Sequence, residues 1–487
     1  MQRNFTGFSR RLPPLALLPL ALFLGAGKPA APIVAPPTTA PAVTAPMAAS
    51  NASGLLPKVT RKTLANGLEV LVEEDHRIPI VAVNLYYHVG SKDEAKDKNG
   101  FAHLFEHVMF QGSKHVPEDT FFATLEKAGA TGINGTTNDD RTNYFETVPA
   151  NRLALALWLE SDRMAFLLDH AGAETFASQR EVVKNERRQN YETAPYGRVA
   201  EFARATLWPE SHPYHRLTIG TPEDLDRASI ADVQGFFRTW YVPNNASISI
   251  VGDTTPAEAF ALVEKYFGPI PGGKLPSRAA PPLPVASRSR QLTVEADVTS
   301  ARVQFAWVSP AMFAPGDAEL DLAASVLAAG ASTRLEKALV YEQKLANSVS
   351  VHQASRQYGS DFWISVNLRR PDALPAVTAA VTAAIDDLAS RGPSADELVR
   401  AKTRYRTMYL ASLEQASARA NQRNMYLQFL GDPDAFEKDL ARYEQATVDG
   451  VKNAVATWLP KKGRLAISVV PTAGAGVAGK LVKTEDL

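Results

Sequence analysis

The sequence predicts an α+β protein of two similar domains, each a mostly antiparallel sheet with helices packed on one face. Short runs rich in β-branched residues are grouped with pairs of helical patterns. A Pro/Gly-rich stretch from Pro269 to Pro284 separates two halves of similar length. The second half loosely repeats the order of strand and helix patterns. We therefore expect an internal duplication, inferred from element order because no letter-by-letter repeat is visible.

The N-terminal region has two segments that we expect to lie outside both domains. Residues 1–27 carry Arg3, Arg10 and Arg11 before an apolar run, Leu12 to Leu24, which is too short to span a membrane and is typical of a signal peptide. Residues 28–54 form an Ala/Pro-rich tether. The remaining boundaries are a first domain at 55–270, an interdomain linker at 271–287, a second domain at 288–475 and a tail at 476–487.

Composition restricts the class of protein. Hydrophobic residues make up 45% of the chain and charged residues 21%, and the formal net charge is zero. This balance is typical of a globular protein and gives no electrostatic case for nucleic acid. The chain has no cysteine, so disulfides are excluded. Together with the signal peptide, we expect a bacterial periplasmic protein without a membrane span in its mature form, with secretion as the alternative.

Individual elements follow from local periodicity, from β-branched runs and from turn residues. In the first half we expect strands at 68–73, 80–88, 142–148 and 246–251, and helices around 101–110, 118–128, 152–168, 174–192 and 199–207. In the second half we expect strands at 291–295, 302–308, 348–354, 361–367 and, as the last, 465–470, with helices at 317–329 and after Ser394. Ser394 and Glu397 form a capping box that starts the long helix.

The segment from Gly100 to Phe110 holds the residues that carry chemistry. On a helix, His103, Glu106 and His107 fall within one arc of about 100°, and apolar residues fill the opposite side. Two imidazoles four residues apart can share one Zn²⁺, and a Glu beside the second can hold the attacking water without being a ligand. This is the inverted zinc motif H-x-x-E-H. It predicts Zn²⁺, one per chain, in a catalytic domain at 55–270, with a third ligand from elsewhere.

The motif and the segment from Glu181 to Glu186 make the chain resemble the pitrilysin/insulinase family of zinc peptidases, which includes the mitochondrial processing peptidase. The resemblance covers most of 58–470. It implies that Glu186 is the third metal ligand, with Glu181 as the rival on another face of the same helix. Where the family usually has a second Glu, this chain has Gln179, which the resemblance places in the second shell of the metal.

The family resemblance also implies a substrate-binding strand. The segment with Asn134, Gly135 and Thr136 looks like the edge strand that adds a substrate backbone as an extra β-strand beside the zinc. An ordinary hairpin with an Asn-Gly turn is the alternative. His212 and His215 also lie in a family-like segment, and we expect them to be loop residues without a metal.

One family feature is missing. Active members use an Arg and a Tyr from a second-half type domain to steady the scissile carbonyl, and alignment places Val340 and Asn347 at these positions. Neither side chain can replace the Arg or the Tyr. A different alignment would instead place Arg334 or Tyr341 at these positions. We therefore expect a zinc endopeptidase that cleaves extended peptides as one subunit of a heterodimer, whose homologous partner supplies the Arg and Tyr. The alternative is a non-catalytic peptide-binding or structural subunit, against which the intact Glu106 argues.

Overall fold

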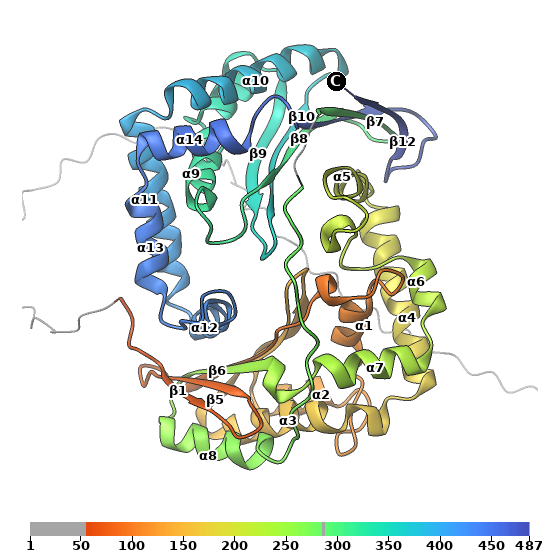
Figure 1. Ribbon diagram of the computed structural model, residues 1–487, viewed down its shortest axis with the longest axis vertical. Coiled ribbons are helices and arrows are strands. Elements are labelled where there is room, and N and C mark those ends of the chain that lie inside the picture. The colour runs from red at the N-terminus through yellow and green to blue at the C-terminus, as the bar shows by residue number, and fades with distance from the viewer. Residues whose placement is uncertain (1–54, 285–287, 487) are drawn as a thin grey trace, which may run out of the picture. The chain divides into compact units, whose positions relative to one another are not determined.

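The computed structural model describes residues 55–284 and 288–486, which form one compact unit. The expected signal peptide and tether lie outside the described residues. Two six-stranded sheets form the framework, shown in Figure 1. In spatial order, the first sheet contains β1 (Thr60–Thr63), β2 (Glu69–Glu74), β6 (Ala246–Gly252), β3 (Ile80–Tyr87), β5 (Thr142–Pro149) and β4 (Thr131–Thr137). The second contains β12 (Lys480–Asp486), β7 (Arg290–Ala296), β11 (Leu465–Pro471), β8 (Arg302–Ser309), β10 (Ser360–Leu368) and β9 (Ala346–Ala354).

Five strands of each sheet share the same topology. Each sheet contains one parallel pair, β2 with β6 and β7 with β11, and its other pairs are antiparallel. In both, a strand from late in the half, β6 or β11, lies between the first two long strands, whereas the sixth strand is the N-terminal β1 in the first sheet and the C-terminal β12 in the second. The predicted fold class, two similar α+β domains with mostly antiparallel sheets, is confirmed.

The helices cover both sheets. Those of the first half are α1 (Phe101–Val108), α2 (Phe121–Lys127), α3 (Leu153–His170), α4 (Ala173–Arg187), α5 (Val199–Leu207), α6 (Pro222–Arg227), α7 (Ile230–Trp240) and α8 (Pro256–Phe267). Those of the second half are α9 (Asp317–Leu327), α10 (Leu374–Arg391), α11 (Ala395–Ser412), α12 (Ala416–Leu430), α13 (Phe436–Glu444) and α14 (Val448–Trp458). Two segments are π-helical. The segment η3 (Arg188–Glu192) directly follows α4, and η6 (Glu336–Glu342) follows the loop after α9.

Each sheet has its own helices on one face and a helix from the other half on the opposite face. Ala420 of α12 packs against Ala82 and Val251 of the first sheet, and Figure 1 shows α12 beside this sheet. Conversely, α5 of the first half packs against the second sheet, where Val199 and Ala203 lie in one hydrophobic core with residues of that sheet. The exchange explains why β6 is buried at every position, since both faces of the strand are covered.

A buried ion cluster fixes α12 on the first sheet. Arg419 Nε donates to Glu73 Oε1 at 2.7 Å, and Arg423 Nε donates to Glu73 Oε2 at 2.6 Å. None of the three side chains is more than 2% exposed. Removing one partner of such a buried pair leaves an uncompensated charge, so the cluster makes the association of the two halves specific.

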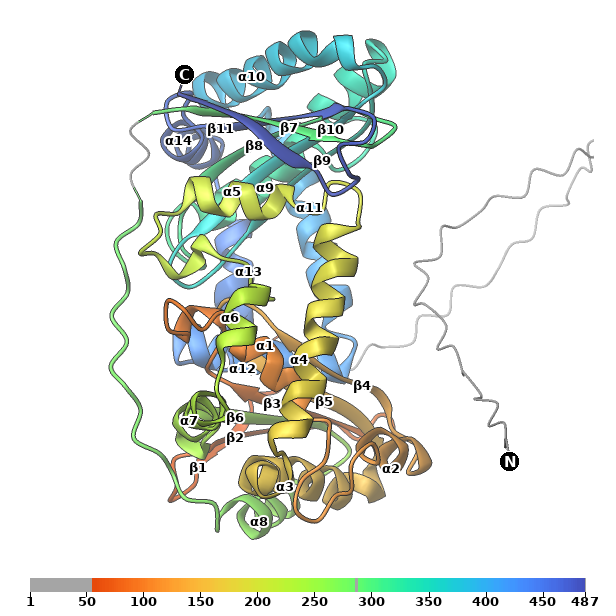
Figure 2. The same cartoon turned by 90° about the vertical axis from the view of Figure 1, so that its right-hand side faces the viewer.

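The linker and the C-terminal strand were predicted less completely. Residues 271–284 of the expected linker have no helix or strand, and Figure 2 shows this segment running between α8 and the second sheet. The sequence predicted 465–470 as the last strand, but β12 lies within the expected tail and pairs with β7. The residues of β12 are nearly all exposed. The strand therefore lacks the hydrophobic alternation from which a strand is predicted, and its backbone pairing with β7 defines it.

Two helix boundaries also differ from the prediction for local reasons. Helix α2 begins at Phe121 rather than 118, because Asp119 has a φ of 59° and interrupts a helix there. The helix expected to reach Glu192 is α-helical only to Arg187 and continues as η3.

One stretch of the described residues, Pro371–Arg391, is long and apolar enough to cross a membrane by length and composition. It contains α10, whose Val377, Val381 and Leu388 are buried in the core of the second half. We interpret α10 as a helix that covers the second sheet.

Candidate metal centre

Helix α1 presents a polar face because its other side is buried. Phe101, Leu104, Phe105 and Val108 are at most 1% exposed. The ring of Phe105 packs among aromatic rings of α4, α7 and Tyr241 at centroid distances of 5.3–5.8 Å. This packing fixes the rotation of the helix about its axis. The three polar residues of the motif are therefore directed away from the core.

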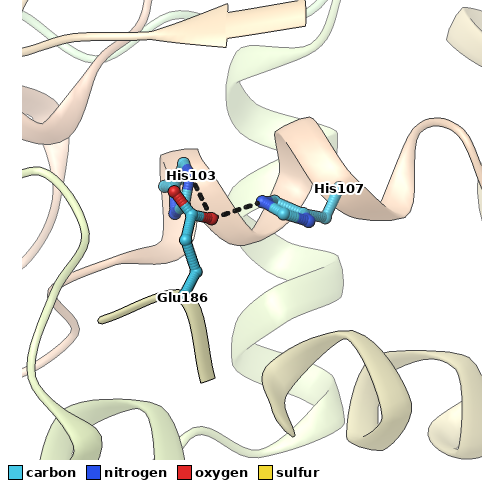
Figure 3. A group of neighbouring side chains, drawn as sticks. All are labelled: His103, His107 and Glu186. Carbon is cyan, nitrogen blue, oxygen red and sulfur yellow. Dashed lines mark ion pairs between the residues drawn. The ribbon is translucent and has the colours of Figure 1, made fainter. Parts of the chain in front are cut away.

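The structure brings His103, His107 and Glu186 together although Glu186 lies on α4. Glu186 Oε2 is 3.6 Å from His103 Nε2 and 3.3 Å from His107 Nε2, and Figure 3 shows the carboxylate directed at both imidazoles. Four ligands at about 2.0–2.1 Å from a tetrahedral zinc ion are about 3.3–3.4 Å from one another. The two nitrogen–oxygen distances fit this spacing. Among the residues that the structure describes, no other group of three His, Cys, Asp or Glu side chains is arranged to hold a metal.

The pKa values of two of these groups suit a metal site. Burial lowers the pKa of His103 to about 4, so its imidazole is neutral near pH 7. Contact with the His107 imidazole holds the pKa of Glu186 below its usual value. Metal ligands must be deprotonated, and two imidazole nitrogens with one carboxylate are a donor set that zinc binds.

Glu106 lies beside the three donors and outside their group. Burial raises its pKa above the usual value for a carboxyl group. A raised pKa brings a carboxylate closer to the range in which it can accept and return a proton near neutral pH. A Cβ on Gly135 of β4 would be 3.1 Å from Glu106 Cγ, so the base lies against this strand.

Strand β4 is the edge of the first sheet on the side of α1. It contains the three residues expected to bind substrate: Asn134 is exposed, Gly135 is buried and Thr136 is half-buried. Pairing with β5 places Asn134 opposite Phe145 and Gly135 opposite Tyr144, so the segment is a strand and its Asn-Gly pair is not a hairpin turn. No strand of the described residues pairs with its outer edge, and the Gly135 N–H donates to Asn134 Oδ1 at 2.9 Å.

The rival ligand and the expected second-shell residue lie elsewhere on α4. Glu181 is exposed and pairs with Lys184 at 3.1 Å. Gln179 is buried, but no hydrogen bond joins its amide to Glu186. Asn190 of η3, which the sequence analysis did not single out, donates to Glu186 Oε1 at 3.3 Å. Its position four residues after Glu186 was the available signal.

Sequence reasoning also missed the residue that caps α1. Glu94 accepts hydrogen bonds from the backbone N–H groups of Gly100 at 2.9 Å and Ala102 at 2.8 Å. Gly100 itself has no side chain to cap the helix. A carboxylate at this end satisfies free N–H groups and complements the helix dipole. It lies seven residues before the first residue of the helix, outside the usual capping positions.

Of the second-half residues considered for the missing Arg and Tyr, three have contacts within their own half. Arg334 forms ion pairs with Asp387 at 2.8 Å and Glu397 at 2.7 Å. Val340 packs against the second core, and Asn347 donates to a backbone carbonyl of β10 at 3.3 Å. Tyr341 is 56% exposed and is the one phenol of this segment.

His212 and His215 have partners within their own loop. His212 Nδ1 accepts from the backbone N–H of Tyr214 at 3.1 Å, and its ring lies 4.4 Å from that of Trp208. His215 Nδ1 bonds the carbonyl of Trp208 at 2.8 Å. Both histidines thus have structural contacts.

Comparison with known proteins assigns the chain to a class. A model of the insulinase family, peptidase family M16, matches residues 69–215, and a model described as the peptidase M16 inactive domain matches residues 227–405. The chain belongs to this peptidase family.

Individual relatives agree with the assignment. The zinc protease PqqE of Helicobacter pylori is 28% identical over 379 residues, which cover 76% of this chain and 83% of the relative. The probable mitochondrial-processing peptidase subunit beta of Schizosaccharomyces pombe is 27% identical over 382 residues, 75% of this chain and 81% of the relative.

Solved structures share the fold. The crystal structure of a protease from Helicobacter pylori superimposes with a TM-score of 0.78 at 25% identity, covering 85% of this chain and all of that one. The periplasmic protease PqqL from Escherichia coli has a TM-score of 0.70 at 20% identity, covering 85% of this chain and 48% of that one.

The positions of Glu186 and Glu181 lead to a direct test of the third ligand. We expect Glu186→Ala to lose zinc, because a catalytic zinc site typically has three protein ligands. Glu181→Ala removes the same side chain from an exposed face of α4 and should retain about one zinc per chain. Metal content after gel filtration measures both. Full zinc in Glu186→Ala would exclude Glu186 as a ligand.

Proposed function

We propose that this chain is a zinc-dependent endopeptidase that hydrolyses extended or unfolded peptides. The observation that carries the proposal is the spacing of His103, His107 and Glu186 beside Glu106 and the open edge of β4. The family assignment and the names of the relatives support a peptidase with zinc. The proximity of these groups supports a site that combines a metal donor set, a base and a strand for the substrate.

Each residue has a separate task in this proposal. His103, His107 and Glu186 would hold one zinc ion per chain, and zinc in such a site would supply Lewis-acid polarisation of the scissile carbonyl and make the attacking water more acidic. Glu106 would accept a proton from the attacking water and later pass it to the leaving amine. Asn190 holds Glu186 Oε1, so the other oxygen remains directed at the imidazoles.

The edge of β4 supports the choice of substrate. An extended peptide can complete unpaired backbone groups as an added strand, whereas a folded protein does not offer a free strand. Asn134, Gly135 and Thr136 would line the substrate beside Glu106. Side chains that alternate along the added strand would then determine sequence preference.

A partner subunit follows from the second half. Val340 and Asn347 provide no cation and no phenol, and Arg334 is held by two carboxylates. We propose a heterodimer with a homologous chain that supplies the Arg and the Tyr. The relative named as a beta subunit of a processing peptidase supports a two-chain arrangement.

We also propose export to the periplasm. The Arg-rich start and apolar run of residues 1–27 support a signal peptide, and the Escherichia coli structural neighbour is described as periplasmic.

A second candidate function is a non-catalytic peptide-binding subunit, favoured by the match of residues 227–405 to a domain described as inactive.

Glu106→Gln separates catalysis from metal binding. Gln has nearly the same shape but cannot accept the proton, so peptide hydrolysis should fall by about 10²–10⁴-fold. Zinc content should stay at about one per chain, because Glu106 lies outside the donor group. Cleavage of a quenched fluorescent peptide and metal analysis of the same preparation test this. Unchanged hydrolysis would favour a contaminating protease or another base.

Gly135→Pro tests the substrate strand, with Gly135→Ala as its matched control. Both add a Cβ beside Glu106, but only Pro removes the backbone N–H. We expect kcat/KM to be several-fold lower for Pro than for Ala, as for a lost hydrogen bond of about 1 kcal/mol. Zinc content should not change in either. Equal kcat/KM values for the two variants would contradict the proposed pairing of the substrate with β4.

The partner proposal predicts weak activity for the isolated chain. Loss of donors to a developing oxyanion typically lowers turnover by a factor on the order of 10²–10³. Adding the homologous partner should raise the turnover of the chain by the same factor. The measurement is peptide cleavage at fixed zinc with increasing partner, alongside light scattering. Full activity of a monomer or homodimer would contradict the heterodimer.

A further inference from the structure

The candidate metal centre depends on two helices that are distant in sequence and are connected behind the donors. Helix α1 carries both imidazoles, and α4 ends one residue after Glu186, at Arg187. The loop before α6 lies between the start of α1 and the end of α4. The contacts in this region determine how far Glu186 lies from His103 and His107.

Arg187 joins α4 to this loop. Its Nη1 donates to the backbone carbonyl of Gly220 at 2.8 Å, and its Nη2 donates to Glu201 Oε1 at 2.7 Å. The side chain is only 7% exposed. Arg198 holds the other oxygen of Glu201 at 3.2 Å. Glu192 Oε1 of η3 also lies 3.4 Å from Arg187 Nε. The two Nη groups are thus held by two hydrogen-bond acceptors in a fork, as Arg geometry favours.

Gly220 in turn lies against the start of α1. It has a φ of +78°, and a Cβ there would be 2.4 Å from the carbonyl oxygen of Asn99. Gly100, the residue directly before α1, has a φ of +97°, and a Cβ there would be 2.9 Å from the carbonyl oxygen of Ile219. Each position requires glycine for its conformation and for the close approach of the two backbones.

A continuous connection therefore runs from the residue beside Glu186 to the residue before α1. Arg187 holds Gly220, Gly220 packs on Gly100, and the carbonyl of Gly100 accepts the first helical hydrogen bond from Leu104 at 2.8 Å. His103 lies between Gly100 and Leu104 in the first turn of α1. Glu94 holds the same end of α1 from the other side through the Gly100 N–H.

We propose that Arg187 is a positioning residue that sets the distance between the carboxylate of Glu186 and the two imidazoles. The inference rests on the proposed zinc site. Arg187 touches neither the metal donors nor the substrate, and it acts through the backbones of Gly220 and Gly100. Loss of its hydrogen bond to Gly220 should let the end of α4 move relative to α1.

The neighbouring Arg188 provides a matched control. It is exposed, and its guanidinium contacts only the side chain of Asn185 among the hydrogen-bond partners found in the described residues. Arg187→Gln and Arg188→Gln make the same chemical change at adjacent positions. We expect zinc affinity, measured by competition with a chelating dye, to fall about 10–100-fold for Arg187→Gln. Arg188→Gln should keep the affinity of the parent chain.

The melting temperature of the zinc-free protein separates positioning from general stability. A purely structural role would lower this temperature and leave the zinc affinity of the folded protein unchanged, and that result would overturn the proposal. Arg187→Lys keeps the charge but cannot reproduce the two-armed fork. It should bind zinc more weakly than the parent and more tightly than Arg187→Gln. If Arg187→Gln does not fold, unchanged zinc affinity in Arg187→Lys overturns the proposal.

Glu186→Ala in the same titration distinguishes the two possible failures. Loss of zinc in Glu186→Ala with normal affinity in Arg187→Gln rejects the role of Arg187 and leaves the proposed site intact. Full zinc binding in Glu186→Ala rejects the third ligand, and the positioning role with it.

Discussion

The requirement to cover both faces of two apolar sheets determines the rest of this structure. Helices of the same half bury one face of each sheet, and the other face is buried by a helix from the opposite half. The small residues Ser247 and Ser249 of β6 lie on the face that α12 covers, and Asn424 of α12 donates to the carbonyl of Asn84 on β3 at 2.8 Å. The halves are therefore separate in sequence and mutually dependent in packing.

The buried cluster around Glu73 fits this dependence. Burying a carboxylate is costly unless it is paired and hydrogen-bonded. Two guanidinium groups from α12 satisfy its two oxygens, and Asp434 accepts from Arg423 in turn. An apolar contact alone would permit α12 to slide along the sheet, whereas this charge pattern permits one position. The first sheet consequently gives the metal centre a rigid base.

Rigidity of that base matters because the donors come from two separate helices. Aromatic packing around Phe105 fixes α1, and the buried Arg187 and the paired glycines Gly100 and Gly220 fix α4 relative to it. The open side of the site is the edge of β4, which has no neighbouring strand on that side among the described residues. Five strands of the second sheet repeat the topology of the first, but the helix at the corresponding place, α9, carries no H-x-x-E-H motif. Of the two similar halves, one carries the metal-competent donors and the other lacks the motif.

The sequence by itself determined the fold class, the paired imidazoles and the adjacent Glu106, because each depends on local periodicity. Spacing along one helix is enough to place His103 and His107 on a common face. Most strands followed from β-branched runs, but β1 and β12 did not, since their mostly exposed residues carry no alternation. Strand β4 was expected from family resemblance alone. The choice of Glu186 over Glu181 came from family resemblance, and the structure places only Glu186 near the imidazoles. The contact of Asn190 with Glu186 had a local signal in the four-residue spacing of the two positions. Tertiary structure alone decided the contacts of Glu94, Arg187 and α12. These depend on how distant segments meet, and no local pattern in the sequence records such meetings.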